Sequence, residues 1–516
     1  MALEREVSSQ RSDATGPRRV PAGPATIRLR SLCDSGSVRP PAPRHVVVVG
    51  GGISGLAAAE FLRRDAPPAT RVTVLEAADR VGGKLRVGEL AGVPMDEGAE
   101  SLLLRRPEGV ALTAAAGLEL APAVTTSASV WTRGRLRPLP PRTVMGVPTD
   151  LRALVASGLL RPGELARVPA DRWLPRARLG DDVSVGRHVA ARLGTGVLDR
   201  LVEPLLGGIY AGRAEDLSMA ATLPQLWPYV RRERSLLAAA RACRRATGLP
   251  GGGPPGEPDN APVEGAVFGA PPGGLGRLPE AVAALSRATV RTSVTVRALR
   301  RTTTGWHVVT GPAPDPEVIA ADAVVLAVPP APAARLLRDE VPGAAVELGR
   351  VRTASMAVVS LAFPAAAVPA VTGSGFLVPP VEDRTVKAVT FSSAKWSSVA
   401  AAAPGLALLR ASVGRLGEEA VLQRDDRELA GLAVADLTDA LGITAAPVDV
   451  RVTRWGGGLP QYDVGHRARV ARIRAAVAGV AGLAVCGATY DGVGVPACIA
   501  TAESAVADLL RQWRGD

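Results

Sequence analysis

The chain has 516 residues, which is too long for one small core and predicts one large domain with insertions or two to three domains. Its formal net charge of +12 comes mostly from scattered arginines. Without a helix-turn-helix, zinc-finger or stacking-aromatic pattern, these argue against nucleic-acid binding and favour a basic cleft for an acidic small molecule. No apolar run reaches the roughly 20 residues that span a bilayer, so we expect a soluble protein with at most peripheral membrane contact.

Strands and helices are predicted to alternate along most of the chain. Residues 1–43, rich in Arg, Pro, Ser and Gly, are predicted to form a disordered extension. Short apolar runs predict strands at 45–50, 71–76, 321–329 and 482–488. Apolar periodicity predicts helices at 55–64, 184–194, 234–245 and 497–513. Short buried strands linked by helices indicate a parallel sheet in an α/β domain.

Three longer regions have distinct compositions. Region 150–245, rich in Ala, Leu and Arg, is predicted to be mostly helical. Region 246–265, rich in Gly and Pro, is predicted to be a flexible loop. Region 346–480 contains alternating strands, such as the one at 354–363, and is predicted to form a second sheet.

The cysteines and histidines are isolated from one another. Cysteines occur at positions 33, 243, 486 and 498, and histidines at 45, 188, 307 and 466, without a CxxC pair or metal-ligand spacing. Isolated thiols of this kind are typical of a reducing compartment. We therefore expect a cytoplasmic protein with reduced cysteines and no metal site.

The stretch HVVVVGGGISGLAAAEFLRR, beginning at His45, places three glycines between a predicted buried strand and a predicted helix. Gly50, Gly52 and Gly55 have the spacing G-x-G-x-x-G, which lets a pyrophosphate approach the backbone at a helix N-terminus. Glu76 ends the next strand, about 20 residues after Gly55. An acidic side chain at this position can accept a hydrogen bond from a ribose hydroxyl. The pattern predicts a dinucleotide site, with a glycine turn that binds no ligand as the alternative.

Further glycine turns favour FAD over NAD. A glycine pair at 82–83, followed by Lys84, lets the chain turn back over the diphosphate and the ribityl group of the cofactor. Residues 98–101 are predicted to form another tight polar turn. Glycines at 487, 492 and 494 directly precede the last predicted helix, which indicates a second anion or carbonyl-oxygen site. Two such loops suit a long ligand with a diphosphate at one end and an electron-accepting ring at the other, which is FAD. For the last loop alone, simple entry into a helix is the alternative.

Longer strings of residues resemble one enzyme family. VEPLLGGIYAGRAEDLSM contains positions 203–212 and RWGGGLPQYDVGHRARV contains positions 460–466, and both are far more specific than the dinucleotide pattern. With GGGISGLAAA and DGVGVPACI, they resemble the flavin amine oxidase-like superfamily and, within it, the protoporphyrinogen/coproporphyrinogen oxidases of haem biosynthesis. The chain is most similar to the bacterial coproporphyrinogen III oxidase type, and the resemblance extends from about residue 44 to residue 512.

The resemblance implies an α/β fold with an FAD-binding Rossmann-like domain of the glutathione-reductase type, a substrate-binding sheet domain and a helical insertion. The implied boundaries are FAD-binding segments at 44–105, 266–345 and 481–516, a substrate-binding helical domain at 106–245 and a substrate-binding sheet at 346–480. The disordered extension at 1–43 and the flexible loop at 246–265 complete this division.

The resemblance also implies which residues form the site. The implied FAD contacts are Gly50, Gly51, Gly52, Ile53, Ser54, Gly55, Glu76, Ala77, Lys84, Gly98, Ala99, Glu100, Ser101, Val296, Trp455, Val493, Gly494 and Val495. The implied substrate contacts are Arg105, Arg106, Gly208, Ile209, Leu377 and Trp396. Arg106 corresponds to a basic residue near the substrate carboxylates, although Pro107 follows it where the family has another basic residue. For the last four, ordinary core packing is the alternative.

The implied activity is the FAD- and oxygen-dependent six-electron oxidation of coproporphyrinogen III to coproporphyrin III with release of H₂O₂. We expect three two-electron steps, each passing a meso hydride to flavin N5, with no catalytic side chain and no metal, because positioning over the flavin matters most. The expected partners are the tetrapyrrole, O₂ and, transiently, another haem-pathway enzyme. The alternatives are protoporphyrinogen IX oxidation, flavin amine oxidation, carotenoid-type desaturation and a non-catalytic dinucleotide-binding module.

Overall fold

The computed structural model describes residues 44–247 and 266–514. The predicted disordered extension at 1–43 and nearly all of the predicted flexible loop at 246–265 lie outside the described residues. Within the described ranges, every helix is too short or too polar to cross a bilayer.

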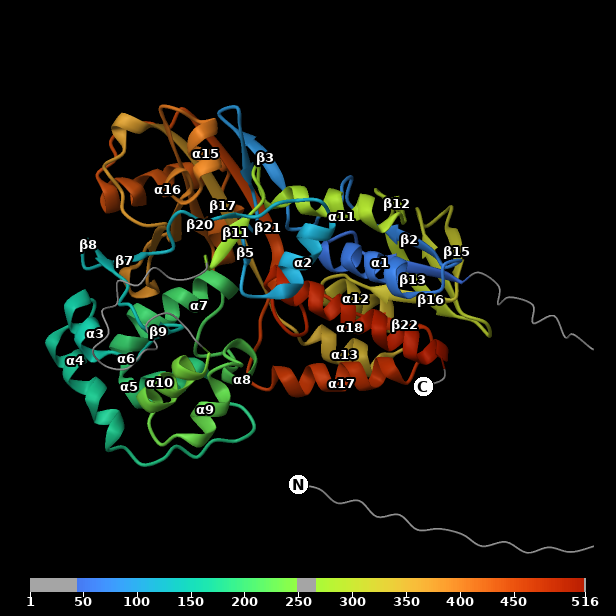
Figure 1. Cartoon of the computed structure of the whole chain (residues 1–516), viewed down its shortest axis with the longest axis horizontal. Coiled ribbons are helices and arrows are strands. Elements are labelled where there is room, and N and C mark those ends of the chain that lie inside the picture. The colour runs from blue at the N-terminus through green and yellow to red at the C-terminus, as the bar shows by residue number, and fades with distance from the viewer. Residues whose placement is uncertain (1–43, 248–265, 515–516) are drawn as a thin grey trace, which may run out of the picture. The chain divides into compact units, whose positions relative to one another are not determined.

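A five-stranded parallel sheet carries the first glycine loop (Figure 1). In spatial order its strands are β12 (Thr289–Arg291), β2 (Arg71–Leu75), β1 (His45–Val49), β16 (Ala323–Leu326) and β22 (Leu483–Val485). The four strands predicted from apolar runs are β1, β2, β16 and β22, so these predictions are confirmed. β1 lies at the centre and is buried along its whole length, as expected for a near-continuous apolar run in a parallel sheet.

Alternate residues of β1 face two separate cores. Val46 and Val48 pack into the core that contains α1 (Ile53–Asp65), α11 (Leu278–Ser286) and α18 (Val495–Arg514). Val47 and Val49 pack into the core that contains the antiparallel strands β13 (Val296–Arg301), β14 (Trp306–Thr310) and β15 (Glu317–Ala321) and the helices α12 (Pro330–Leu337), α13 (Pro342–Gly349) and α17 (His466–Ala478). The predicted helices at 55–64 and 497–513 are therefore confirmed as α1 and α18.

A seven-stranded sheet forms the second layer of strands. Its order is β21 (Asp449–Pro460), β17 (Thr353–Pro364), β20 (Leu406–Val413), β19 (Val386–Phe391), β18 (Gly375–Leu377), β7 (Ser129–Thr132) and β8 (Arg135–Pro138). Helix α16 (Asp426–Leu441) packs against one face of this sheet through its buried leucines. The sheet predicted in region 346–480 is present, and β7 and β8 extend it from the preceding region through parallel pairing with β18.

Region 150–245 is helical, as predicted, and has its own core. Its helices are α3 (Leu151–Ser157), α4 (Pro162–Arg167), α5 (Val185–Leu193), α6 (Thr195–Val197), α7 (Glu203–Tyr210), α8 (Met219–Thr222), α9 (Trp227–Arg232) and α10 (Leu236–Ala246), with a π-helical turn at Leu198–Val202. The predicted helices at 184–194 and 234–245 correspond to α5 and α10.

Short elements connect these layers. They are β3 (Val87–Leu90), β4 (Val93–Asp96), β5 (Leu102–Leu103), α2 (Pro107–Ala115), β6 (Ala121–Pro122), β9 (Thr143–Val144), β10 (Val147–Pro148), β11 (Phe268–Ala270), α14 (Ser392–Lys395) and α15 (Ser397–Ala402). Strand β11 pairs with both β5 and β6, so it joins the chain on the two sides of α2.

Candidate functional site

The first glycine loop lies between the end of β1 and the start of α1. Gly50 has a φ of +106°, and a Cβ there would lie 2.6 Å from the carbonyl oxygen of Ala327. A Cβ on Gly55 would lie 1.9 Å from the carbonyl oxygen of Gly50, so only glycine lets α1 pack this closely on the strand. A Cβ on Gly52 would meet no protein atom within 4 Å. The backbone at Gly52 therefore borders open space at a helix N-terminus, which is where a diphosphate binds.

Glu76 and the second glycine pair meet this loop. One carboxylate oxygen of Glu76 accepts a hydrogen bond from the Gly51 N–H at 2.6 Å, and the other accepts one from the Ala78 N–H at 2.9 Å. The Gly82 N–H donates to the Gly51 carbonyl oxygen at 2.8 Å, and Gly52 and Gly82 form an isolated parallel bridge. The 82–83 turn thus lies directly beside the first loop, and Glu76 stands at its edge.

Val296, one of the implied FAD contacts, lies in the segment that follows this edge. The Val294 N–H donates to the Glu76 carbonyl oxygen at 2.8 Å, which joins the approach to β13 to the end of β2. The Val296 side chain itself is buried in the core shared with β1. The structure therefore brings this segment to Glu76 and turns the Val296 side chain inward.

Lys84 and Trp455 lie together at the turn formed by residues 98–101. The Ala99 N–H donates to the Lys84 carbonyl oxygen at 3.3 Å, and the Trp455 indole N–H donates to the Glu97 carbonyl oxygen at 2.9 Å. A Cβ on Gly98 would approach the Trp455 ring to 3.2 Å. Burial lowers the pKa of Lys84, and within residues 44–247 and 266–514 no carboxylate forms an ion pair with it. A half-buried ammonium group that forms no ion pair within these residues fits a phosphate-bearing ligand.

Glu100 is fully committed to contacts within the protein. Its carboxylate pairs with Lys395 at 2.5 Å and with Arg410, whose guanidinium also donates to the Gly98 carbonyl oxygen at 2.5 Å. Burial by itself would raise the pKa of Glu100, but the charges of Lys395 and Arg410 outweigh it and lower the pKa to about 2. Trp396, 7% exposed, lines a small cavity of about 110 Å³ together with Glu100 and Arg410. Glu100 thus joins the turn at residues 98–101, which are implied FAD contacts, to the seven-stranded sheet.

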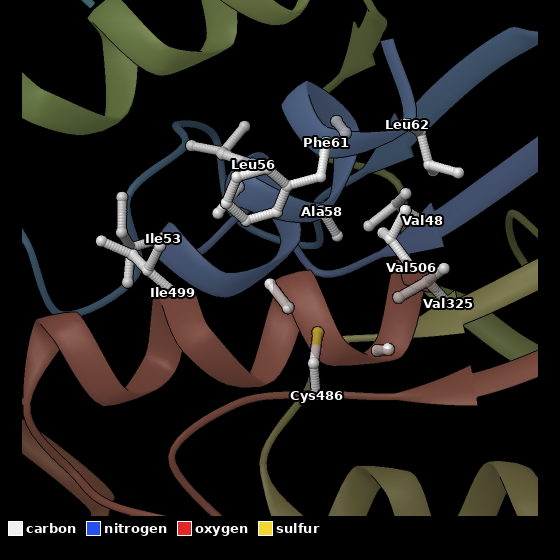
Figure 2. Packing of buried hydrophobic residues seen from close by; sticks show 14 of the residues in the cluster. Val48, Ile53, Leu56, Ala58, Phe61, Leu62, Val325, Cys486, Ile499 and Val506 are labelled. Atoms are coloured by element: carbon white, nitrogen blue, oxygen red, sulfur yellow. The ribbon is translucent and has the colours of Figure 1, made fainter. Parts of the chain in front are cut away.

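The C-terminal glycine loop meets the first one. A Cβ on Gly487 would lie 3.8 Å from the Ser54 hydroxyl, and the Cys486 sulfur lies 3.9 Å from the Ser54 carbonyl oxygen. Ile53 and Ile499, in the first turns of α1 and α18, share one core and point toward each other in Figure 2. The N-termini of α1 and α18 are therefore neighbours, with Val493, Gly494 and Val495 at the start of α18.

A stack of buried aromatic rings holds the C-terminal loop, and the sequence had assigned these rings no role. The Tyr462 hydroxyl donates to the Ala488 carbonyl oxygen at 2.6 Å, and His466 Nε2 lies 3.1 Å from the Tyr490 carbonyl oxygen. The Tyr462 and His466 rings stack with centroids 4.0 Å apart, and the Tyr210 ring lies 5.5 Å from Tyr462. Tyr462 and His466 come from the PQY-x-x-GH string and Tyr210 from the GGIYAG string. The two specific strings therefore form one packing unit.

Three of the implied substrate contacts lie together at the end of α7. A Cβ on Gly208 would lie 3.6 Å from a Leu377 methyl group on β18. Ile209 beside it is 41% exposed, which is unusual for a large apolar side chain next to a buried core. Gly208, Ile209 and Leu377 therefore form an apolar surface open to solvent, whereas Trp396 lies in the small cavity beside Glu100.

Arg105 and Arg106 lie between β5 and α2, and both are exposed. The Arg106 guanidinium forms two hydrogen bonds with Glu108, at 3.1 and 2.8 Å. A Cβ on Gly109 would approach Pro496 to 3.1 Å, so the start of α2 lies against the start of α18. The arginines are therefore near the C-terminal glycine loop, and Arg106 already has a carboxylate partner within the chain.

The chain matches the pattern of the flavin-containing amine oxidoreductase family over residues 53–510. It is 38% identical to the coproporphyrinogen III oxidase of Mycobacterium tuberculosis (strain ATCC 25618 / H37Rv), with 91% of this chain and 98% of that protein covered. It is 33% identical to the coproporphyrinogen III oxidase of Bacillus subtilis (strain 168), with 90% and 98% covered. Protoporphyrinogen oxidase 1 of Spinacia oleracea is 29% identical, with 90% and 84% covered.

Solved structures share the fold. A structure from Exiguobacterium sp. 255-15 that carries a provisional protoporphyrinogen oxidase name superposes with a TM-score of 0.78 at 31% identity, covering 91% of this chain and 99% of that one. Cyclohexylamine oxidase from Brevibacterium oxydans IH-35A superposes with a TM-score of 0.65 at 17% identity, covering 92% and 100%. At that identity the second likeness concerns the fold alone.

Proposed function

Because this chain belongs to the family of flavin-containing amine oxidoreductases, we propose that it oxidises coproporphyrinogen III to coproporphyrin III in haem biosynthesis, with FAD as its cofactor. The overall reaction removes six electrons and six hydrogens from the porphyrinogen and reduces three O₂ to three H₂O₂. The observation that carries the proposal is the meeting of the two glycine loops at neighbouring helix N-termini. Curated relatives that span the chain and bear the coproporphyrinogen III oxidase name support the choice of substrate.

The chain's own features fit FAD. The open space at Gly52 suits the diphosphate, as does Lys84, which forms no ion pair with any described residue, and Glu76 at the end of β2 suits the ribose. We assign the remaining contacts to the residues implied by the sequence, namely Gly50, Gly51, Ile53, Ser54, Gly55, Ala77, Gly98, Ala99, Glu100, Ser101, Val296, Trp455, Val493, Gly494 and Val495. When bound, FAD accepts electron pairs from a substrate carbon and returns them to O₂.

The protein's part in the reaction is to bind and orient the tetrapyrrole. Gly208, Ile209 and Leu377 offer an apolar surface to the macrocycle, and Trp396 lies beside the turn at 98–101. Arg105 and Arg106 at the start of α2 are suited to the propionates, because guanidinium groups pair with carboxylates in a bidentate way. We assign no side chain as a general acid or base.

The test supplies coproporphyrinogen III and protoporphyrinogen IX separately to the purified flavoprotein. Porphyrin fluorescence and H₂O₂ are followed together, with autoxidation subtracted. We expect faster turnover of coproporphyrinogen III, with one H₂O₂ formed for each electron pair removed. Preferred turnover of protoporphyrinogen IX would assign the alternative substrate. Turnover of a primary amine with neither porphyrinogen oxidised would reject the proposal.

Two variants test whether Arg106 contacts the propionates of the substrate. Arg106→Glu should raise KM for coproporphyrinogen III, because it places a carboxylate against the propionates. Glu108→Gln removes the carboxylate that holds Arg106 in the absence of substrate, and should leave KM unchanged or lower it. An unchanged KM in Arg106→Glu would remove this residue from the substrate site.

We also propose that the protein works in the cytoplasm. Cys243, Cys486 and Cys498 are free and buried, which supports a reducing compartment. Cell fractionation followed by the porphyrinogen assay tests this, and activity recovered with salt-washed membranes would contradict it.

A further inference from the structure

Lys387, on β19, is a buried cation without a hydrogen-bond partner. Its side chain is 3% exposed, and in the described part of the chain its ammonium group has no acceptor. Arg415, which follows β20, is 5% exposed and donates to the Val378 carbonyl oxygen at 3.0 Å. The Val378 N–H in turn donates to the Lys387 carbonyl oxygen at 2.9 Å, which places both cations at the same end of β19.

The nearby carboxylates neutralise this pair only in part, through an ion pair between Glu418 and Arg415. Glu418 is half-exposed and lies 3.4 Å from Arg415 and 3.8 Å from Arg213, so it is shared between two guanidinium groups. Glu203 on α7 accepts from the Ala214 N–H at 2.8 Å, and burial raises its pKa to about 7 despite the opposing charge of Arg415. A buried ammonium beside a second cation is costly unless an anion joins it. Burial, with a smaller effect from Arg415, accordingly lowers the pKa of Lys387 to about 7.

The position of Lys387 relates it to the substrate surface at the end of α7. Helix α7 packs against β18 and β19, and Leu377, which faces Gly208, pairs with Ala388, the residue after Lys387. The Leu416 N–H donates to the Ala211 carbonyl oxygen at 2.7 Å, so the turn after β20 is joined to the end of α7. Lys387 therefore lies next to the apolar surface assigned to the macrocycle.

The distance from Lys387 to the turn at residues 98–101, which we assign to FAD binding, suits a side arm of the macrocycle. Thr390 on β19 pairs with Arg410, whose guanidinium contacts Gly98. Lys387 lies three residues further along the strand, or roughly 10 Å at the rise of a β-strand. A β-bulge between Val386 and Ala388 interrupts the strand at Lys387, and bulges near active sites commonly redirect a side chain.

We propose that Lys387, with Arg415 beside it, forms a buried subsite that receives one carboxylate of the substrate. The inference rests on the proposed function and names a specificity residue that is separate from Arg105 and Arg106. A carboxylate entering beside α7 gives the ammonium group an anionic acceptor, which none of the described residues provides. When one propionate of the tetrapyrrole occupies this subsite, the ring lies over Gly208 and Leu377. One meso carbon then faces the turn at residues 98–101, which we assign to FAD binding.

The experiment compares Lys387→Met with wild type as flavin-loaded proteins. The Kd of coproporphyrin III is measured by fluorescence titration, with the tetramethyl ester as the uncharged ligand. We expect Lys387→Met to raise the Kd and KM for the tetracarboxylic compounds at least tenfold, to change kcat less than threefold, and to leave the Kd of the ester unchanged. Lys387→Arg should restore most of the affinity. Arg300→Met, on the exposed edge of β13, removes one positive charge elsewhere and should behave as wild type.

A second readout needs no turnover. Because Lys387→Met removes a buried amino group that has no hydrogen-bond acceptor in the described part of the chain, the midpoint of thermal unfolding without ligand should stay the same or rise. The stabilisation by coproporphyrin III should shrink. An unchanged Kd for coproporphyrin III in Lys387→Met would overturn the subsite. An equal loss of affinity for the acid and the ester would also overturn it, because that pattern indicates altered packing. Failure of the wild-type protein to oxidise either porphyrinogen would instead reject the proposed function.

Discussion

The two glycine loops that meet at the site are held in different ways. The loop at 50–55 is built from adjacent residues, because β1, the turn and α1 follow one another and Gly55 packs directly on the Gly50 carbonyl oxygen. The loop at 487–494 is held by residues far away in sequence. Tyr462 and His466 bind its carbonyl oxygens, and Tyr210 packs behind Tyr462.

This difference separates two kinds of constraint. In the first loop, Gly50 and Gly55 are required because a Cβ at either position would clash with a backbone oxygen, so substitution there damages the fold. At Gly52 a Cβ meets no protein atom within 4 Å, so substitution there affects the space assigned to the ligand. In the second loop, position is set by hydrogen bonds and ring stacking from another segment, so substitution outside the loop can displace it. The first loop is therefore held by close packing between neighbouring residues, and the second by the contacts of Tyr462 and His466 with its carbonyl oxygens.

The largest effect is expected for Gly55→Ala. Its Cβ would lie 1.9 Å from a backbone oxygen, so α1 must move away from β1 at a cost of about 3 kcal/mol. Urea unfolding of the FAD-free protein measures this. Gly431→Ala in α16, where a Cβ meets nothing within 4 Å, is the matched control and should stabilise by about 0.5–1 kcal/mol. Equal stabilities for the two variants would contradict the steric account of the first loop.

Acid should weaken the anchor of the second loop. Burial lowers the pKa of His466 to about 4, although the Tyr490 carbonyl works in the opposite direction. The unfolded state, with a pKa near 6.5, then binds the proton more readily. The stability from neutral His466 is complete above pH 6.5 and is lost as the pH falls toward 4.

Between pH 7 and pH 5 this loss is about 2 kcal/mol. The comparison is between urea unfolding of wild type and of His466→Gln at both pH values. The variant should lose about 2 kcal/mol less than wild type over this interval. The same pH dependence in both proteins would show that another group titrates.

Gly52→Ala should separate folding from cofactor binding. Because a Cβ at this position meets no protein atom within 4 Å, the free energy of unfolding without FAD should change by less than about 0.5 kcal/mol. The same methyl group enters the space assigned to the diphosphate, so the Kd of FAD should rise about tenfold, or about 1.4 kcal/mol. Flavin titration of the apoprotein measures this, and an unchanged Kd would place the diphosphate elsewhere.

The smallest effect is expected for Tyr462→Phe. The variant keeps the ring stack but removes the hydroxyl that donates to the partly buried Ala488 carbonyl oxygen, at a cost of about 1 kcal/mol. Flavin affinity should fall about fivefold, since the loop that carries Gly492 and Gly494 loses one anchor. Tyr229→Phe on α9 is the control and should bind FAD as wild type does. Equal affinity in both variants would mean that the ring stack alone positions the loop.

The strands and helices around the nucleotide site were predictable because their signals are local. Four valines followed by G-x-G-x-x-G specify a buried strand, a tight turn and a helix within one stretch of sequence. The last helix was predictable for the same reason. Short strands are harder to predict from local sequence, because their position is set mainly by the strands beside them. Strands β12 and β22 have three residues each, and only β22, which lies inside a clear apolar run, was predicted.

The anchors could not be derived because they join distant segments. Nothing local in PQYDVGH indicates that Tyr462 reaches Ala488 or that Tyr210 packs behind it, although the string itself stood out as specific. The pairing of Arg106 with Glu108 did have a local signal, two residues apart in RRPE. Lys387 had only a compositional signal, as one of three lysines among 61 basic residues, and its burial is visible only in the structure.

The strand order of the parallel sheet has a consequence for biosynthesis. β1 begins at His45, and its neighbour β16 pairs on the other side with β22, which ends at Val485. At the usual pace of translation, the ribosome needs on the order of tens of seconds between these two strands. During that time the valine-rich strand β1 has already been synthesised. The edge strand β22 and the helix α18, which packs against the sheet, have not. We expect the nascent chain to need a chaperone during this interval and to become resistant to protease only near the end of translation.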